Sequence, residues 1–258
     1  MSLKFVILGS GSSMGVPRAD SYSGDCDLKN KKNFRTRCSA LIKFYDQNIL
    51  IDTSPDLRQQ MISNKVKTIN KVFYTHKHGD QTHGINDLRP FFLKNKKKIP
   101  VYADRETSKY LYSTFKYCFI AAKFYPTMLS LNKLKNEHIF VKKNKKIKVR
   151  AIPVKHGDIK SNCYIINDKL AYASDVSLIY QKDFKRLKKI DYLIIDCLWE
   201  RNFTHSHLNL DKVLNLVKLI KPKKTILTNM STDFDYNKLK IRLPKNIVPG
   251  YDGMEISL

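Results

Sequence analysis

The chain has 258 residues, 42% of them hydrophobic and 28% charged, which is the balance of an ordinary globular protein with a sizeable core. Its net charge of +25 favours either a polyanionic partner such as nucleic acid or a lysine-rich surface that reflects composition alone. The five scattered cysteines and the lack of an apolar run near ~18 residues exclude a disulfide framework and a membrane-spanning helix, so we expect a cytoplasmic protein without membrane association.

In the first half of the chain, apolar runs rich in β-forming residues predict five strands, at 3–8, 40–45, 49–52, 71–74 and 99–103. A long polar segment from 12 to about 37 follows the first strand, and a loop of that length is usually functional or mobile. Helices are predicted over 55–63, where Pro55 suits the first turn, and over 106–119.

The second half repeats this rhythm. Strands are predicted at 138–141, 147–153, 162–167, 169–173, 192–196, 225–228 and 254–257, and helices at 177–187 and 210–220. Each half has adjacent strands followed by strand–helix alternation. This order predicts an α/β fold, an αββα sandwich of two mixed β-sheets with outer helices, over one domain of residues 1–258.

A histidine-rich loop follows the strand at 71–74. His76, His78, Asp80 and His83 lie within eight residues, directly after the apolar run Val72 to Tyr74. Histidines two apart on a loop can turn both imidazoles toward one cation, and a nearby aspartate offers an oxygen ligand or a base. The spacing therefore predicts a metal site.

Four further polar side chains lie at predicted strand ends or in a later loop. Asp52 ends the strand at 49–52, His156 follows the strand at 147–153, Asp175 follows the strand at 169–173, and His205 lies in a segment that also contains His207. Metal clefts are built in this way, from loops on a rigid scaffold.

The loop motif resembles the His-x-His-x-Asp-His motif of the metallo-β-lactamase superfamily. Within it, the chain resembles the metallo-β-lactamase-fold phosphodiesterases, above all the cyclic phosphodiesterase of phosphonate breakdown, which acts on phosphoribosyl cyclic phosphate, and more distantly ribonuclease Z. The stretches that match are Leu8 to Gly11, Gly15 to Pro17, Arg37 to Ser39, Ile51-Asp52, the His76 loop, His156, Ser174-Asp175, Asp196-Cys197, His205 with Leu208-Asn209, and Asp252 to Ile256.

The resemblance implies a set of metal ligands. His76, His78 and His156 would hold the first metal, zinc or manganese, through neutral imidazole nitrogens. Asp175 would bridge to a second metal. Asp80 would bind that second metal and orient or deprotonate the attacking water.

Two departures from the family fall on the second metal site. Gln81 stands where the motif has its last histidine, and Asn229 stands where a late segment has another. Neutral amides are poor ligands for zinc or manganese, so we expect one firm metal and a second site that is weak or absent. In the loop after the first strand only Cys26 remains of the family's cysteines, and Thr232 replaces a histidine, so no structural zinc is predicted.

The resemblance also implies supporting and substrate-binding roles. Asp52 would fix the tautomer of a ligand imidazole, and His205 would protonate the leaving oxygen or stabilise the transition state. Guanidinium groups pair bidentately with phosphate, so Arg35, Arg37 and Arg89 are candidates to clamp the substrate, or else form surface ion pairs.

These residues predict a metal-dependent hydrolase, a phosphodiesterase that acts on a small cyclic or nucleotide-like phosphodiester through metal-activated water. The chain lacks the glycine-rich basic arm of ribonuclease Z, so a nucleic acid substrate is less favoured. The alternatives are a thioester or lactone hydrolase on the same fold, or a catalytically weak ligand-binding homologue. A homodimer is common among such relatives.

Overall fold

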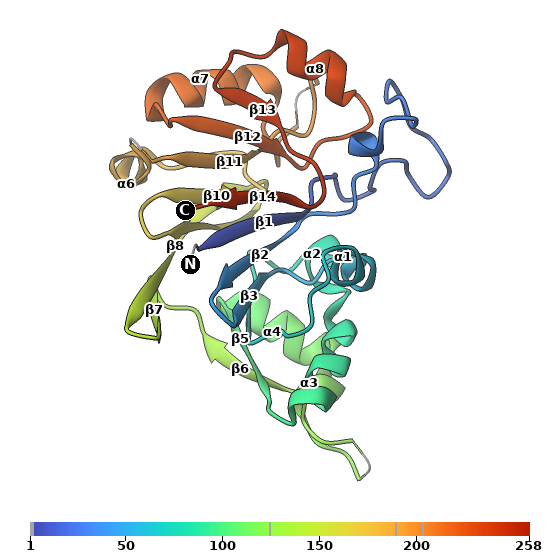
Figure 1. The fold of residues 1–258 in the computed structure, drawn as a ribbon, viewed down its shortest axis with the longest axis vertical. Coiled ribbons are helices and arrows are strands. Elements are labelled where there is room, and N and C mark those ends of the chain that lie inside the picture. Colours follow the sequence, from blue (N-terminus) through green and yellow to red (C-terminus); the bar gives the residue numbers. More distant parts are fainter. Residues whose placement is uncertain (1–2, 124, 189, 203) are drawn as a thin grey trace. The chain divides into compact units, whose positions relative to one another are not determined.

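The computed structural model describes residues 3–123, 125–188, 190–202 and 204–258. The chain divides into two compact units. The first comprises Met1–Leu8, Ser39–Leu134 and Glu255–Leu258, and the second comprises Gly9–Cys38 and Lys135–Met254. Each is built on one seven-stranded sheet with accompanying helices (Figure 1). The single domain over 1–258 stays a prediction.

The first unit contains a mixed sheet. β2 and β3 form an antiparallel hairpin, whereas β3 to β6 run parallel to one another. In spatial order the strands are β14 (Met254–Ser257), β1 (Lys4–Gly9), β2 (Ser39–Phe44), β3 (Gln47–Ile51), β4 (Lys71–Phe73), β5 (Ile99–Ala103) and β6 (Leu129–Lys133). The parallel strands deliver their carboxyl ends, and the loops that follow, to one edge of the sheet.

Short helices connect these strands, and their apolar side chains pack with the strands in one core cluster that includes Leu50, Val72 and Leu111. The described helical segments are α1 (Leu57–Ser63), α2 (Gly79–Thr82), η2 (Ile85–Leu88), α3 (Arg89–Asn95), α4 (Arg105–Thr114) and α5 (Lys116–Phe119).

The second unit contains the other mixed sheet. β7, β8, β9 and β10 pair antiparallel, and β10 to β13 pair parallel. In spatial order the strands are β13 (Ile247–Pro249), β12 (Lys224–Thr228), β11 (Tyr192–Asp196), β10 (Leu170–Ala173), β9 (Ile159–Ile166), β8 (Lys145–His156) and β7 (Glu137–Lys142).

Four helical segments follow this alternation, and a second core cluster, which includes Ile195, Val213 and Leu239, joins them to the sheet. The segments are η3 (Gln181–Asp183), α6 (Phe184–Leu187), α7 (Leu210–Ile220) and α8 (Tyr236–Arg242), and η1 (Lys31–Asn33) lies in the long polar segment. Side chains cap two of the longer helices: Asn209 accepts from the Lys212 amide, and Asp235 accepts from the amides of Asn237 and Lys238.

Two predicted helices differ from the structure. Helix begins at residue 181 instead of 177, because residues 177–180 are held against the end of β8: the Lys155 amide donates to Leu178 O at 2.9 Å, and the Ser177 amide donates to Lys155 O at 2.7 Å. The predicted helix over 106–119 is interrupted at Phe115, whose φ of −117° and ψ of 39° are not helical. The rings of Phe115 and His83 instead lie edge to face, with centroids 5.5 Å apart.

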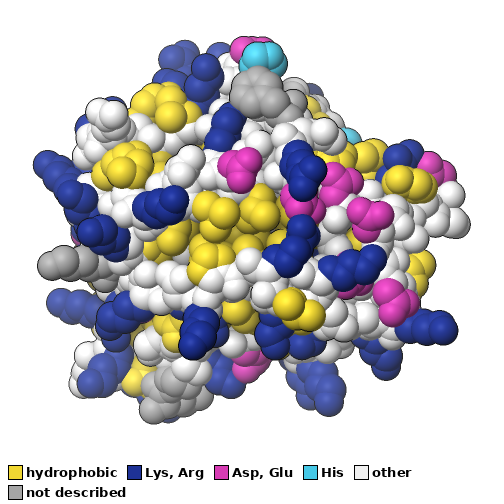
Figure 2. All heavy atoms as spheres, turned by 90° about the horizontal axis from the view of Figure 1, so that it is seen from above, with side chains coloured by type: hydrophobic (Ala, Val, Ile, Leu, Met, Phe, Trp, Pro, Cys, Tyr) yellow, Lys and Arg dark blue, Asp and Glu magenta, His cyan; other side chains and the backbone are white. Residues whose placement is uncertain are grey.

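Positive charge is spread over the surface rather than gathered in one stripe on the face drawn in Figure 2. Lys and Arg side chains are scattered there, with Asp and Glu among them. On this face the distribution fits the compositional interpretation of the net charge. In the part of the chain that the structure describes, no helix combines the length and the apolar character that crossing a bilayer requires.

Replacing Gly84 with alanine is expected to destabilise the first unit by about 3 kcal/mol, because overpacked cores typically lose 1–3 kcal/mol and sometimes more. An alanine Cβ would lie 1.9 Å from the Ser54 carbonyl oxygen, a backbone atom that cannot move aside. The Gly84 amide also donates to Thr53 O, which anchors the histidine loop beside the end of β3. Urea unfolding measures the change, with the exposed Ser63→Ala in α1 as control. A loss below about 1 kcal/mol would contradict the close approach.

Candidate metal centre

Three polar side chains of the second unit follow neighbouring parallel strands. Asp175 lies two residues after β10, Asp196 is the last residue of β11, and Asn229 directly follows β12. Carboxyl ends of parallel strands meet at one edge of a sheet, so the three side chains lie together. All three are buried, with at most 2% of each residue exposed.

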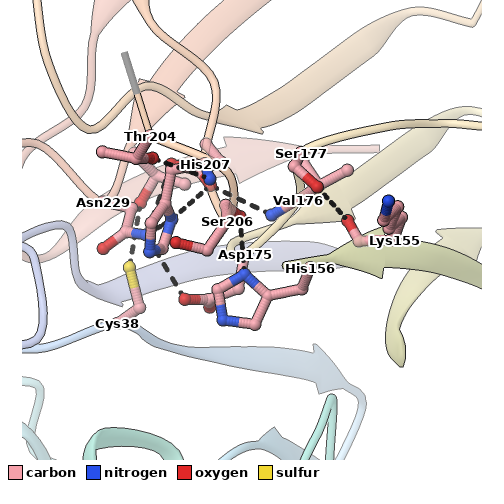
Figure 3. Close-up of polar contacts among 12 residues, drawn as sticks. Cys38, Lys155, His156, Asp175, Val176, Ser177, Thr204, Ser206, His207 and Asn229 are labelled. Carbon is pink, nitrogen blue, oxygen red and sulfur yellow. Dashed lines mark hydrogen bonds and ion pairs between the residues drawn. The ribbon is translucent and has the colours of Figure 1, made fainter. Parts of the chain in front are cut away.

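The Asn229 amide joins the two carboxylates. Its Nδ2 atom lies 3.3 Å from Asp175 Oδ1 and 3.3 Å from Asp196 Oδ1, so its two N–H groups donate to the two acids. Figure 3 shows Asn229 beside Asp175 and His207. Asn229 has a φ of 59°, a left-handed conformation that asparagine adopts more readily than most residues. At the position where the family has a metal-binding histidine, this chain therefore places a hydrogen-bond donor for carboxylates.

His207 completes this group. Its Nδ1 lies 2.7 Å from Asp196 Oδ2, and that same oxygen accepts from the Val176 amide at 3.0 Å. A carboxylate can only accept, so the His207 Nδ1 carries a proton and Nε2 is left for a metal or a substrate. Burial raises the pKa of the Asp196 carboxyl to about 6, and the adjacent His207 acts in the opposite direction.

His156 is held in the same tautomer. It is the last residue of β8, and its Nδ1 lies 2.6 Å from the Ser206 carbonyl oxygen. Because a carbonyl oxygen accepts, Nδ1 is the protonated nitrogen, and Nε2 keeps the lone pair that a metal requires. The rings of His156 and His207 lie edge to face, with centroids 4.8 Å apart.

The donor set of this unit fits a divalent cation. One ligand atom from each of His156, Asp175 and His207 lies within 4.8 Å of the others. Two neutral imidazole nitrogens and one carboxylate oxygen suit zinc and other borderline first-row metals. The chemistry of the side chains, and the tautomers fixed by Ser206 and Asp196, therefore match a metal site.

The other predicted ligands lie in the loop after β4, in the first unit. The rings of His76 and His78 have centroids 4.6 Å apart; His76 is buried and His78 is exposed. Gln81 Nε2 donates to Asp80 Oδ2 at 3.1 Å within α2. Gln81 thus repeats the arrangement of Asn229, because in both cases an amide that replaces a family histidine donates to a carboxylate.

Asp52 orients His76 through Thr75. Asp52 is buried at the end of β3, with φ at 62°, and its carboxylate accepts from the Thr75 amide at 2.7 Å and the Thr75 hydroxyl at 2.8 Å. That hydroxyl oxygen lies 3.0 Å from His76 Nδ1. Since the hydroxyl proton goes to Asp52, the oxygen accepts from Nδ1–H, which leaves the His76 Nε2 to bind a metal. The predicted supporting role of Asp52 requires this kind of contact.

His207 is a candidate site residue that the sequence prediction does not include. The predicted role belongs to His205, which is exposed, whereas His207 contacts Asp196 and lies beside Asp175. Both histidines lie in one irregular segment, and the Ser206 carbonyl between them binds His156. What distinguishes the two histidines is a contact with Asp196 at the end of β11. Only the structure shows that His207 makes this contact.

The three predicted arginines have different environments. Arg35 is 1% exposed, and its terminal nitrogens donate to Phe234 O at 2.5 Å, Ser231 O at 3.3 Å and Asn33 Oδ1 at 3.1 Å. Its predicted role in clamping phosphate is corrected to a structural one, because these donors are already bound inside the unit.

Arg37 and Arg89 remain closer to solvent. Arg37 is half-buried, and its Nε donates to Ser13 O at 3.1 Å. The Arg89 guanidinium is exposed at the start of α3 and lies 5.1 Å from the ring centroid of Tyr125, a cation–π contact. Arg89 lines an apolar cavity, and no contact found among the described residues joins its side chain to the histidine loop.

Comparison with known proteins identifies relatives of the whole chain. A family model for a beta-lactamase superfamily domain matches residues 47–230. The crystal structure of a new diphosphatase from the PhnP family has a TM-score of 0.88 and 28% sequence identity, and the match covers 100% of this chain and 98% of that one.

Two curated proteins also match. The octanoyltransferase of Porphyromonas gingivalis is 28% identical over 256 residues, which are 98% of this chain and 51% of that protein. Ribonuclease Z of Prochlorococcus marinus is 27% identical over 124 residues, 46% of this chain and 39% of that enzyme. This chain thus matches about half, or less, of the length of these curated relatives. Together with the family model, the matches confirm the predicted resemblance and fold class.

Proposed function

This chain belongs to the β-lactamase superfamily and is a hydrolase of the metallo-β-lactamase fold, and we propose that it hydrolyses a phosphoester or phosphoanhydride bond in a small anionic substrate with the help of one divalent cation. The observation that carries the proposal is the fixed tautomer of His156, whose Nδ1 donates to Ser206 O beside the carboxylate of Asp175. The similarity to a diphosphatase and to ribonuclease Z supports phosphorus as the reacting centre.

We propose His156 and Asp175 as metal ligands, and the family motif adds His76 and His78 of the first unit. When bound, zinc or manganese would supply Lewis acidity that polarises a phosphoryl oxygen and acidifies water. Three of these ligands are imidazoles, and the contacts of His76 and His156 leave Nε2 as the coordinating nitrogen in both.

His207 lies near enough to His156 and Asp175 to be a metal ligand, but this proposal assigns it the role of general acid, because the family motif supplies His76 and His78 as the other ligands. Asp196 holds its Nδ1 proton, orients the ring and stabilises the imidazolium, so Nε2–H can protonate the leaving oxygen or stabilise charge on the transition state. Asp80 orients or deprotonates the attacking water, as the motif implies. The pair His207–Asp196 has the same division of labour as other histidine–carboxylate pairs in hydrolases.

The second metal site is weak or absent in this proposal. The Asn229 amide already donates to Asp175, and the Gln81 amide donates to Asp80. The partial positive charge of each amide N–H stabilises its carboxylate. It therefore replaces part of the stabilisation that a second cation would provide. This chain would therefore use one metal where its family uses two.

Metal content and hydrolysis, measured on the same samples, test the proposal. The protein is loaded with excess zinc or manganese and desalted, its metal is counted by mass spectrometry, and bis(p-nitrophenyl) phosphate is the substrate. We expect one metal per chain and measurable hydrolysis, and loss of most of both in His156→Ala. Asn229→His together with Gln81→His should add a second metal.

The same assay separates the rival functions. Hydrolysis of a thioester or lactone without phosphodiesterase activity would favour the thioester or lactone hydrolase. Metal without any hydrolysis would favour the ligand-binding homologue. A metal content that His156→Ala leaves unchanged would overturn the site assignment. The octanoyltransferase activity is not proposed, because this chain matches only 51% of the protein that bears that name.

The cellular compartment, the partner molecule and the oligomeric state of the protein are also proposals. All five cysteines are free and buried, which agrees with a reducing cytoplasm. The proposed partner is a small anionic phosphodiester rather than nucleic acid, and a homodimer is proposed from the family alone.

A further inference from the structure

A cavity of about 630 Å³ opens in the first unit beside the histidine loop. Loop residues 77–79 form one wall, and α4 forms the other. Spacings of three and four residues put the helical contributors on one face of α4. They are Glu106, Lys109, Tyr110 and Ser113.

Two contacts fix the loop to this helix. Lys77 Nζ lies 3.6 Å from Glu106 Oε2, and the Tyr110 hydroxyl lies 2.9 Å from His83 Nε2. The helix itself starts at a defined residue, since the Asp104 side chain accepts from the Thr107 amide. These contacts therefore hold the two walls of the cavity, the loop and α4, in a defined arrangement.

The cavity carries one positive charge that the chain does not offset. Glu106 neutralises Lys77, whereas among the residues that the structure describes no carboxylate forms an ion pair with Lys109. The Ser113 hydroxyl donates to Tyr110 O at 3.0 Å, and the Tyr110 hydroxyl lies 2.9 Å from His83 Nε2, so the ammonium of Lys109 is the cavity's main donor to a ligand. A lysine ammonium suits a phosphate, which it binds as a point charge.

We infer that this cavity binds a second phosphate of the substrate, held by Lys109 next to the phosphoryl group that is cleaved. The inference rests on the proposed function, because His78 of the metal-binding loop lines the same cavity and would place the reacting group beside it. The substrate class is then a small molecule with two phosphoryl groups in series, such as a nucleoside diphosphate or a diphosphate ester, rather than an isolated phosphodiester.

Calorimetric titration of the zinc-loaded protein with adenosine 5′-diphosphate and adenosine 5′-monophosphate, in about 0.15 M salt, tests this inference. The wild-type protein should bind the diphosphate roughly 10-fold more tightly, because a charge-assisted hydrogen bond is worth about 1.5 kcal/mol or more. Lys109→Ala should reduce that ratio to about 2 or less. The matched control is Lys116→Ala, which removes an exposed lysine outside the cavity and should keep the wild-type ratio.

Equal binding of the two nucleotides by the wild-type protein, or a ratio that Lys109→Ala leaves unchanged, overturns the inference. An equal loss in Lys116→Ala also overturns it, since general surface charge would then be the cause. Failure here with hydrolysis of bis(p-nitrophenyl) phosphate intact leaves the proposed function standing. A ratio that depends on Lys109 without any hydrolysis keeps the binding site and removes the catalytic proposal.

Discussion

Replacing His207 with alanine is expected to lower kcat for bis(p-nitrophenyl) phosphate by roughly 10²- to 10⁴-fold, the usual contribution of a general acid or base. The wild-type ring is held by Asp196 at 2.7 Å, and one of its ring nitrogens lies within 4.8 Å of ligand atoms of Asp175 and His156. Alanine removes the proton donor and leaves the buried Asp196 without its imidazole partner. Steady-state kinetics of the zinc-loaded variant measures the loss.

His205→Ala is the matched control for this prediction. It removes an imidazole two residues away in the same segment, from an exposed position, so we expect kcat within about 3-fold of wild type. Metal content measured in parallel separates two roles for His207. Retained metal with lost turnover would identify an acid, whereas loss of both would identify a ligand. The assignment fails if His205→Ala is the variant that loses activity.

Asp196→Asn extends the test to the positioning residue. An amide oxygen accepts from Nδ1–H without stabilising an imidazolium, so kcat should fall while the KM changes little. The histidine–carboxylate pair would then explain why the aspartate at the end of β11 is buried beside an imidazole and not exposed to solvent.

The sequence located the strand ends of the site but not all the side chains that act there. His156 and Asp175 were predicted because each follows a clear apolar strand, and parallel register then brings strand ends to one edge. His205 and His207 could not be told apart, because an irregular segment has no periodicity that fixes which side chain faces inward. That choice depends on Ser206 O and Asp196, which come from distant parts of the sequence.

The two amides illustrate a second limit of sequence reasoning. Comparison with the motif showed that Gln81 and Asn229 replace histidines, which predicts a weakened second metal site. The structure adds what each amide does: it donates to the carboxylate, Asp80 or Asp175, that the motif assigns to that metal. For Asn229 the partner lies 54 residues earlier in the chain, so this contact has no signature in local sequence. Its geometry decides whether a lost ligand leaves a gap or a replacement contact.

Arg35 shows why charge patterns mislead at buried positions. An arginine in a polar loop favours a surface or substrate-binding role, yet its guanidinium spans backbone carbonyls that belong to residues almost 200 positions later. Burial lowers the pKa of the Arg35 guanidinium, while the thiol of Cys26 and the carboxylates of Asp252 and Asp235 act in the opposite direction.

Replacing Arg35 with alanine is expected to reduce the free energy of unfolding by about 3–5 kcal/mol, in the range found when a buried charged partner is removed. The change removes the guanidinium hydrogen bonds to Phe234 O, Ser231 O and Asn33 Oδ1, and a hydrogen bond to a charged group is worth about 1.5–3 kcal/mol. It also opens a cavity where a side chain only 1% exposed was packed. Urea unfolding monitored by circular dichroism measures the loss.

Arg37→Ala provides the comparison, because Arg37 is half-buried two residues further on and should cost about 1 kcal/mol or less. Arg35→Lys should recover only part of the stability, since an ammonium cannot reach three acceptors in the planar arrangement that a guanidinium spans. If Arg35→Ala unfolds at the wild-type urea concentration yet weakens substrate binding, the phosphate-clamp interpretation returns. If it is destabilised but keeps its KM at low temperature, Arg35 serves the fold that carries the site and does not touch the substrate.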